Sequence, residues 1–141
     1  MKLWSGLGFY RRAENIYKTC IIINHKFNGK FPNKYEDILS LPGIGRTTAS
    51  AIVTFSGYEK RSILDGNVKR FLSRLFGIDY TQAKVNSLWE ISEGLLSNSR
   101  PADFIQAYMD IGSLICKKSK PLCDNKTTTS APCFLALFIF F

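Results

Sequence analysis

The sequence predicts an all-α fold, and three observations support this prediction. Apolar residues recur at spacings of three and four along most of the chain, as they do on the buried face of an amphipathic helix. No segment shows the strict apolar–polar alternation of a half-buried β-strand. The chain has 141 residues, 45% of them hydrophobic and 21% charged, which fits one globular domain.

Six helices are expected, separated by glycine, proline or polar breaks. The first lacks both Gly and Pro, and the loop that follows it contains Gly29 and Pro32. Pro101 suits the first turn of the last helix, where its missing N–H costs nothing. In chain order, the expected helices are residues 11–23, 35–39, 46–55, 67–76, 84–96 and a segment that begins at Pro101.

The inward face of each helix follows from its apolar spacing. In the first helix the expected inward residues are Ile16, Cys20 and Ile23. In the later helices they are Val68, Phe71, Leu72, Leu75, Val85, Leu88, Trp89, Leu95, Leu96, Phe104, Tyr108, Ile111 and Ile115. His25, the single histidine, is expected at the surface without a catalytic role.

The charge balance favours a polyanionic partner. Nineteen Lys and Arg residues against 11 Asp and Glu give a formal net charge of +8, so nucleic acid is the first candidate and an anionic membrane surface the second. A merely basic, soluble surface is the alternative. The longest apolar run, residues 133–141, is short of the ~20 residues of a membrane helix. No secretory signal is apparent, which predicts an intracellular protein whose cysteines serve as thiols or metal ligands.

The composition changes after Asn125. Residues 127–141 contain no charged residue, and residues 127–132 are of low complexity. The interpretation is a core over residues 1–125 and an aberrant apolar tail over residues 126–141, produced by a reading-frame slip or an aberrant splice.

Residues 41–49, LPGIGRTTA, join two expected helices through a tight turn with two glycines. Glycine permits positive φ and close approach of a phosphate, and the N–H groups that begin the second helix favour an anion. This pattern predicts a sequence-independent grip on a DNA strand, which a bound monovalent cation sometimes completes. An ordinary helix–helix corner is the alternative.

Asp65 directly precedes a helix, next to Gly66, and Lys69 and Arg70 follow on the next turn. Taken alone, the pattern favours a helix cap. One helix and one short loop separate Asp65 from the glycine turn, so both are expected on the same side. A third pattern is Cys116 and Cys123 with six residues between them. This pair is weak evidence for a metal site, because a four-thiolate cluster requires two more ligands and Cys133 is a poor third; two free thiols in a basic loop are the alternative.

Taken together, these residues resemble the adenine DNA glycosylases of the MutY type, in the helix-hairpin-helix superfamily that includes endonuclease III. The resemblance covers Leu3 to about Cys123 and implies a helix-hairpin-helix glycosylase core, incomplete in this chain. At Thr47, endonuclease III-like enzymes carry the lysine that attacks the sugar, and threonine cannot form a Schiff base. The segments that carry the resemblance are residues 3–13, 29–32, 41–49, 64–70, 109–116 and 119–123.

The resemblance implies hydrolysis of the N-glycosidic bond of adenine mispaired with 8-oxoguanine or guanine in double-stranded DNA, after base flipping. Asp65 would stabilise the positive charge on the sugar or trap it covalently, and Asn67 would hold Asp65 and bond near the sugar and phosphate. Phe9 and Tyr10 lie where the family uses an aromatic wedge; for Tyr10, core packing is the alternative. The expected DNA contacts are Phe9, Tyr10, Leu41, Gly43, Gly45, Arg46, Thr47, Lys69 and Arg70, with Lys117, Lys118 and Lys120 as further candidates in a loop that is otherwise simply solvated.

The sequence also departs from the family pattern. Cys116 and Cys123 match the first two ligands of the family's [4Fe–4S] cluster, but Lys126 and Pro132 stand where the other two would fall, so the cluster is not expected to assemble. No residue matches the general-acid glutamate or the domain that reads 8-oxoguanine. The chain is therefore expected to be a monomeric fragment with impaired activity. The alternatives are a non-catalytic DNA-binding module, an endonuclease III-like lyase and, more distantly, an iron–sulfur redox protein.

Overall fold

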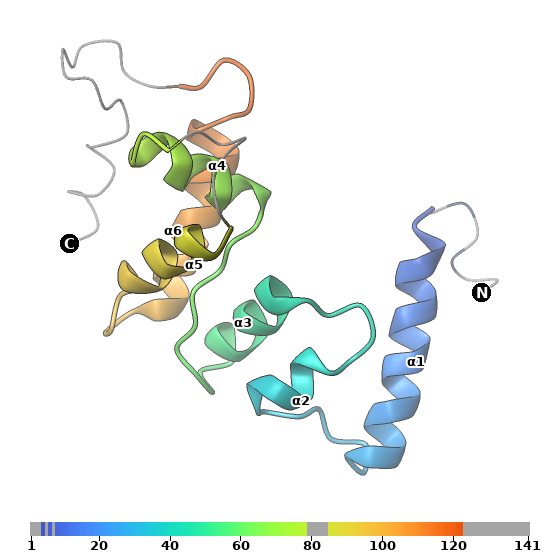
Figure 1. Cartoon of the computed structure of the whole chain (residues 1–141). Helices are drawn as coiled ribbons and strands as arrows, with labels where there is room; N and C mark the ends of the chain where they lie inside the picture. Colours follow the sequence, from blue (N-terminus) through green and yellow to red (C-terminus); the bar gives the residue numbers. More distant parts are fainter. Residues whose placement is uncertain (1–3, 5, 7, 79–84, 123–141) are drawn as a thin grey trace. The chain divides into compact units, whose positions relative to one another are not determined.

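The computed structural model describes residue 4, residue 6 and residues 8–78 and 85–122, and these form helices without any strand (Figure 1). The predicted all-α class is therefore confirmed for this part of the chain. The chain divides into two compact units, Met1–Glu59 and Lys60–Phe141. The helices are α1 (Tyr10–Lys26), α2 (Tyr35–Leu39), α3 (Arg46–Phe55), α4 (Gly66–Leu75), α5 (Val85–Gly94), α6 (Pro101–Asp110) and the π-helix η2 (Ile111–Ile115).

The first unit has a small core between α2 and α3. The predicted bounds of both helices are confirmed. Tyr35 and Ile38 of α2 pack with Ala49 and Val53 of α3 in one buried cluster. This packing fixes the turn between the two helices, because each of them begins or ends at that turn.

Helix α1 contains no buried residue, and the predicted inward positions of Ile16 and Cys20 are wrong. Ile16 is 48% exposed and Cys20 is exposed as well. The helix meets the turn after α2 through a polar face instead, where the Thr19 hydroxyl donates to the carbonyl of Pro42 at 3.4 Å. Apolar spacing identified the helix but not the face that makes contact. His25 is exposed, as predicted.

The second unit is organised around α4, which contacts α5, α6 and η2. The four apolar residues predicted to face inward from α4 are all buried, so this prediction is confirmed. Leu88 and Trp89 of α5 and Ile105 and Tyr108 of α6 are buried as well. The rings of Phe71 and Tyr108 form an edge contact with centroids 5.9 Å apart. Burial raises the pKa of Tyr108 because the ionised form loses its hydration.

The end of α6 departs from the predicted helix. The chain continues as the π-helix η2, and Ile115, predicted to be buried, is 46% exposed. A π-turn holds more residues than an α-turn, so positions extrapolated at 3.6 residues per turn no longer face the core. Val85, the first residue of α5, was also predicted to face inward and is 50% exposed.

Gly112 explains how η2 approaches α4. A Cβ at this position would lie 2.8 Å from Cβ of Asn67 and 2.9 Å from the backbone carbonyl carbon and oxygen of Asn67. Real Cβ atoms are not found this close to backbone, so only glycine permits this contact. Gly112 thereby brings the start of η2 against the first turn of α4.

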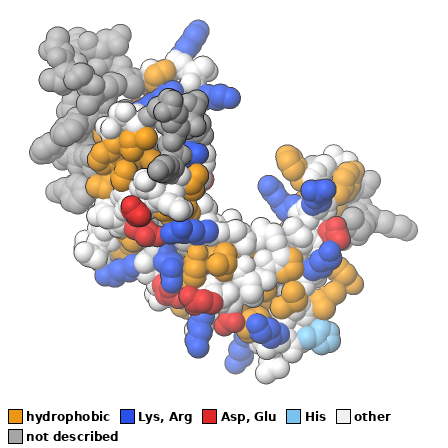
Figure 2. Space-filling view, viewed as in Figure 1, with side chains coloured by type: hydrophobic (Ala, Val, Ile, Leu, Met, Phe, Trp, Pro, Cys, Tyr) orange, Lys and Arg blue, Asp and Glu red, His pale blue; other side chains and the backbone are white. Residues whose placement is uncertain are grey.

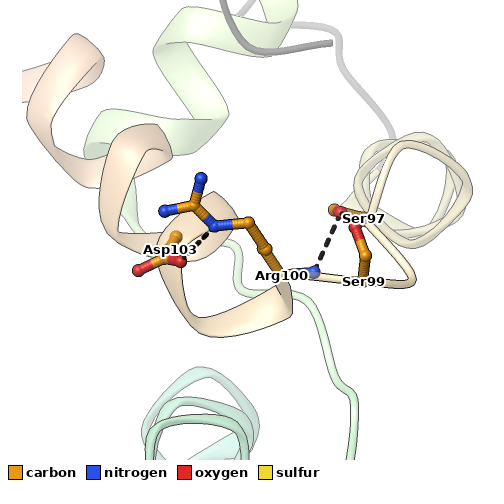
Figure 3. A network of polar contacts seen from close by, with 4 residues as sticks. All are labelled: Ser97, Ser99, Arg100 and Asp103. Atoms are coloured by element: carbon orange, nitrogen blue, oxygen red, sulfur yellow. Dashed lines mark hydrogen bonds and ion pairs between the residues drawn. The ribbon is translucent and has the colours of Figure 1, made fainter.

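A polar network closes the connection between α5 and α6 (Figure 3). Arg100 donates from Nε to Oδ2 of Asp103 at 2.7 Å, and its backbone N–H donates to the Ser97 hydroxyl at 3.2 Å. Both charged side chains are largely exposed, so this ion pair is worth only about 0–1 kcal/mol.

Figure 2 shows Lys and Arg side chains on the surface of both units, in keeping with the basic composition. No helix among residues 8–78 and 85–122 is both long and apolar enough to cross a membrane. The predicted tail over residues 126–141, together with Cys123 and Cys133, lies outside the described residues.

Candidate nucleic-acid interface and carboxylate site

The turn between α2 and α3 is built as the sequence predicted. Leu41 is 2% exposed and anchors the turn in the core, and the backbone N–H of Ile44 donates to its carbonyl at 3.1 Å. Gly43 has φ +78°, and a Cβ there would lie 2.5 Å from Nδ2 of Asn15. Glycine is therefore required at this position by both backbone conformation and space.

Helix α3 begins directly after this turn, and Gly45 is its N-cap residue. Gly45 has no side chain with which to cap the helix, and an uncapped helix N-terminus suits an external anion. Arg46 is exposed and Thr47 half-buried at the start of α3. Leu41 is buried, so any contribution it makes to DNA binding comes from its backbone or from support of the turn. The predicted DNA contacts of these residues remain predictions.

Asp65 is the N-cap of α4, as the capping interpretation predicted. Its Oδ1 accepts hydrogen bonds from the backbone N–H of Asn67 at 2.9 Å and of Val68 at 2.7 Å. Within the described residues, Oδ2 accepts no hydrogen bond. The half-buried carboxylate thus holds the helix through one of its two oxygens.

Asn67 and Arg70 form a polar chain beside Asp65. The Asn67 backbone donates to Asp65, while its side-chain oxygen accepts from Nη2 of Arg70 at 2.9 Å. Arg70 also donates from Nε to the Cys116 carbonyl at 2.8 Å and from Nη2 to the Gly112 carbonyl. Asp65, Asn67 and Arg70, predicted as a site from sequence, therefore lie together on the first turns of α4. Most of the Arg70 donors engage protein acceptors, and its phosphate contact stays a prediction.

Arg74 is a neighbour of this site that sequence reasoning missed. Its Nη1 donates to Sγ of Cys116 at 3.3 Å and to the Lys117 carbonyl at 2.8 Å, and its Nη2 donates to the Lys118 carbonyl at 3.3 Å. The signal was present, since Arg74 follows Arg70 by one helical turn. With Arg70 and Lys118 it lines a cavity of about 540 Å³ that has no acidic residue in its wall.

Cys116 is the thiol of the second unit that lies within the described residues. Cys116 is fully buried, and its sulfur accepts from the Arg74 guanidinium. The described residues contain no group of three His, Cys, Asp or Glu side chains that could hold a metal ion, and Cys123 lies outside them. Cys20 is exposed on α1 in the other unit. The expectation that the cluster does not assemble, with Lys126 and Pro132 at the other two expected ligand positions, stays a prediction.

The aromatic pair before α1 is exposed. Phe9 is 76% exposed with φ 50°, and the Arg12 guanidinium lies 5.3 Å from its ring centroid. Tyr10 is 54% exposed, so the alternative of core packing for Tyr10 is wrong. Both rings are accessible to a stacking partner.

The two helices α2 and α3, joined by a turn with two glycines, place the chain in the class of helix-hairpin-helix proteins. The family described as HhH-GPD superfamily base excision DNA repair protein matches residues 1–94, and the chain belongs to this family. The predicted family resemblance is thereby confirmed.

The curated relatives extend this finding. The chain is 48% identical over 125 residues to an adenine DNA glycosylase of Buchnera aphidicola subsp. Baizongia pistaciae, covering 88% of this chain and 36% of the relative. The human adenine DNA glycosylase is 35% identical over 128 residues, covering 88% of this chain and 23% of the relative. The chain therefore spans only a minor part of the length of the relatives it matches.

Solved structures show the same fold. A thermostable thymine-DNA glycosylase superposes with a TM-score of 0.74 at 31% identity, covering 81% of this chain and 54% of that one. A trapped covalent endonuclease III–DNA intermediate gives a TM-score of 0.71 at 25% identity, covering 84% of this chain and 55% of that one.

Proposed function

We propose that this chain carries the carboxylate and the DNA-gripping turn of an adenine DNA glycosylase that acts in base excision repair. The observation that carries the proposal is the Asp65 carboxylate, held at a helix N-terminus through Oδ1 with Oδ2 left for a ligand. The adenine glycosylases among its relatives support the choice of base. The substrate proposed is double-stranded DNA with adenine opposite 8-oxoguanine or guanine, bound by a monomeric intracellular protein.

The reaction breaks the bond between C1′ of deoxyribose and N9 of adenine. The bonding electron pair leaves with the base, and positive charge develops on C1′ and the ring oxygen. A carboxylate next to this charge stabilises it, as the second carboxylate does in glycoside hydrolysis. Water then adds to C1′ and loses a proton. Protonation of the departing adenine is a separate contribution, worth ~10²–10⁴-fold, and none of the residues predicted here is assigned to it.

The turn around Gly43 and Gly45 would hold the DNA backbone. The N-terminus of α3 has no side-chain cap, so a phosphate, with or without a bound monovalent cation, suits it. Arg46 and Thr47 at this end, Lys69 and Arg70 on α4, and the exposed rings of Phe9 and Tyr10 are the proposed contacts.

A non-catalytic DNA-binding module is the second candidate. The observation that favours it is that α2, α3 and their turn have a buried cluster of their own. This element keeps its structure whether or not Asp65 takes part in chemistry. The module would bind duplex DNA in a salt-dependent manner and release no base.

The test is single-turnover release of adenine from an 8-oxoguanine:A duplex, run beside Asp65→Asn. Release that vanishes in the variant supports the glycosylase. Duplex binding without release by the wild-type chain supports the module. Release that persists in Asp65→Asn contradicts the role proposed for the carboxylate.

A further inference from the structure

Two buried hydroxyls lie beside the segment that leads into Asp65. Ser62 is 1% exposed and precedes α4 by four residues, while Ser92 is 0% exposed and belongs to α5. Their oxygens are 2.6 Å apart, and Oγ of Ser92 also lies 2.8 Å from the carbonyl oxygen of Ile63. Neither residue was predicted as part of a site.

The directions of these hydrogen bonds follow from the number of protons. A serine hydroxyl carries one proton, and the Ser92 proton is donated to the Ile63 carbonyl, which can only accept. The bond between the hydroxyls must therefore use the Ser62 proton, with Ser92 as its acceptor. The result is a short relay from Ser62 through Ser92 to the backbone of Ile63.

This relay restrains backbone that lies between two helices. The segment between α3 and α4 belongs to no helix, and Ile63 is 1% exposed. A buried carbonyl without a partner is costly, so Ser92 settles where the Ile63 carbonyl lies. Ile63 precedes Asp65 by two residues, and the position of this carbonyl limits where the carboxylate can be placed.

We infer that the Ser62–Ser92 pair positions the Asp65 carboxylate for its contact with a positively charged sugar. This inference rests on the function proposed for Asp65. Ser62 and Ser92 are positioning residues, since they act through the backbone and touch no substrate. A carboxylate that stabilises charge must be held within roughly 0.5 Å of its working position, and a buried relay from a neighbouring helix supplies such a restraint.

The experiment compares two duplexes in which the target adenosine is replaced. One carries a pyrrolidine, a cationic mimic of the charged sugar, and the other a neutral tetrahydrofuran. The readout is the ratio of the two dissociation constants. This ratio reports how strongly the Asp65 carboxylate favours the charged mimic over the neutral one, and it needs no turnover. We expect the wild-type chain to prefer the cationic duplex by about tenfold or more, and Asp65→Asn to lose this preference.

Three variants separate positioning from packing. Ser92→Ala breaks both bonds of the relay and should lose most of the preference, by about tenfold. Ser62→Ala leaves the bond from Ser92 to Ile63 intact and should lose less. Ser73→Ala is the matched control, since Ser73 is equally buried on α4 and its hydroxyl has no hydrogen-bond partner among the residues that the structure describes. It should keep the wild-type ratio, and all variants should bind the neutral duplex as the wild type does.

Each outcome decides a different point. A full preference in Ser92→Ala overturns the positioning inference and leaves the proposed function intact. No preference in the wild-type chain overturns the role of Asp65 and this inference with it. An equal loss in Ser73→Ala assigns the effect to packing and overturns positioning. If Ser92→Ala does not fold, Ser62→Ala decides, and an unchanged ratio in that variant contradicts the relay.

Discussion

The turn before α3 and the turn before α4 lead into helices of equal length, ten residues each, yet they present opposite charges. The first ends in Gly45 and has no side-chain cap, so the positive end of the helix dipole faces an incoming group. The second ends in Asp65, whose carboxylate takes two backbone N–H groups and adds a negative charge. The turn before α3 therefore suits a phosphate and the turn before α4 suits a cationic sugar, although each is a turn that leads into a ten-residue helix.

Substituting Asp65 should produce the largest difference between the two turns. In Asp65→Asn the side chain still caps the helix, while the charge is lost. We expect adenine release to fall by about 10²–10³-fold or more, with almost unchanged thermal unfolding. Asp65→Ala should lose the same activity and in addition about 1 kcal/mol of stability. A large stability loss in Asp65→Asn would contradict the separation of cap and charge.

Gly43→Ala should damage the first turn. The variant places a Cβ at φ +78° and 2.5 Å from Asn15, which we expect to cost about 1–3 kcal/mol in the free energy of unfolding and to weaken duplex binding. Gly45→Ala is the matched control for stability, because Gly45 has φ −92° and nothing within 4 Å of an added Cβ. Urea unfolding of both variants measures the difference, and equal losses would contradict the requirement at Gly43.

Gly112→Ala should disturb the turn before α4, although Gly112 belongs to η2. The added Cβ would meet the backbone of Asn67 at 2.9 Å, so η2 must move away from α4. We expect a loss of about 1–3 kcal/mol in thermal unfolding, together with weaker binding of the cationic duplex. Unchanged stability would show that η2 can move without cost. It would contradict the idea that η2 supports the turn around Asp65.

Arg100→Ala should have the smallest effect and serves as the reference for both turns. Arg100 forms an ion pair with Asp103 (Figure 3), in which the Arg100 side chain is 77% exposed and the Asp103 side chain 65% exposed. Exposed pairs are worth about 0.2–1 kcal/mol, so we expect a small loss of stability that salt abolishes. A loss as large as that of Gly112→Ala would mean that the loop between α5 and α6 supports the core.

The sequence predicted the parts of this fold that depend on local rules. Gly43 has a positive φ that favours glycine, and the Asp65 carboxylate caps a helix as aspartate commonly does, so both turns were placed correctly. The inward face of α1 was predicted wrongly, and Ile16 is exposed. Residue spacing identifies an apolar stripe on a helix, but it does not show which element packs against that stripe. The exposed position of Ile115 depends on a π-turn that apolar spacing does not indicate.

In the candidate site, too, the local part was predictable from the sequence and the part that depends on tertiary packing was not. Asp65, Asn67 and Arg70 lie within six consecutive positions on one helix end, so their proximity follows from the sequence. The relay of Ser62 and Ser92 joins residues thirty positions apart, and buried serines have no distinctive spacing. Such a contact becomes visible only when the tertiary packing of α4 against α5 is known.

The two amide protons that Asp65 binds offer a direct record of its resting position. The N–H groups of Asn67 and Val68 exchange with deuterium only when their bonds to Oδ1 open. Their exchange rates therefore report how often the carboxylate leaves the helix end. A cationic sugar bound at Oδ2 should leave both rates slow, whereas a carboxylate that swings away to reach its ligand should make both amides exchange faster.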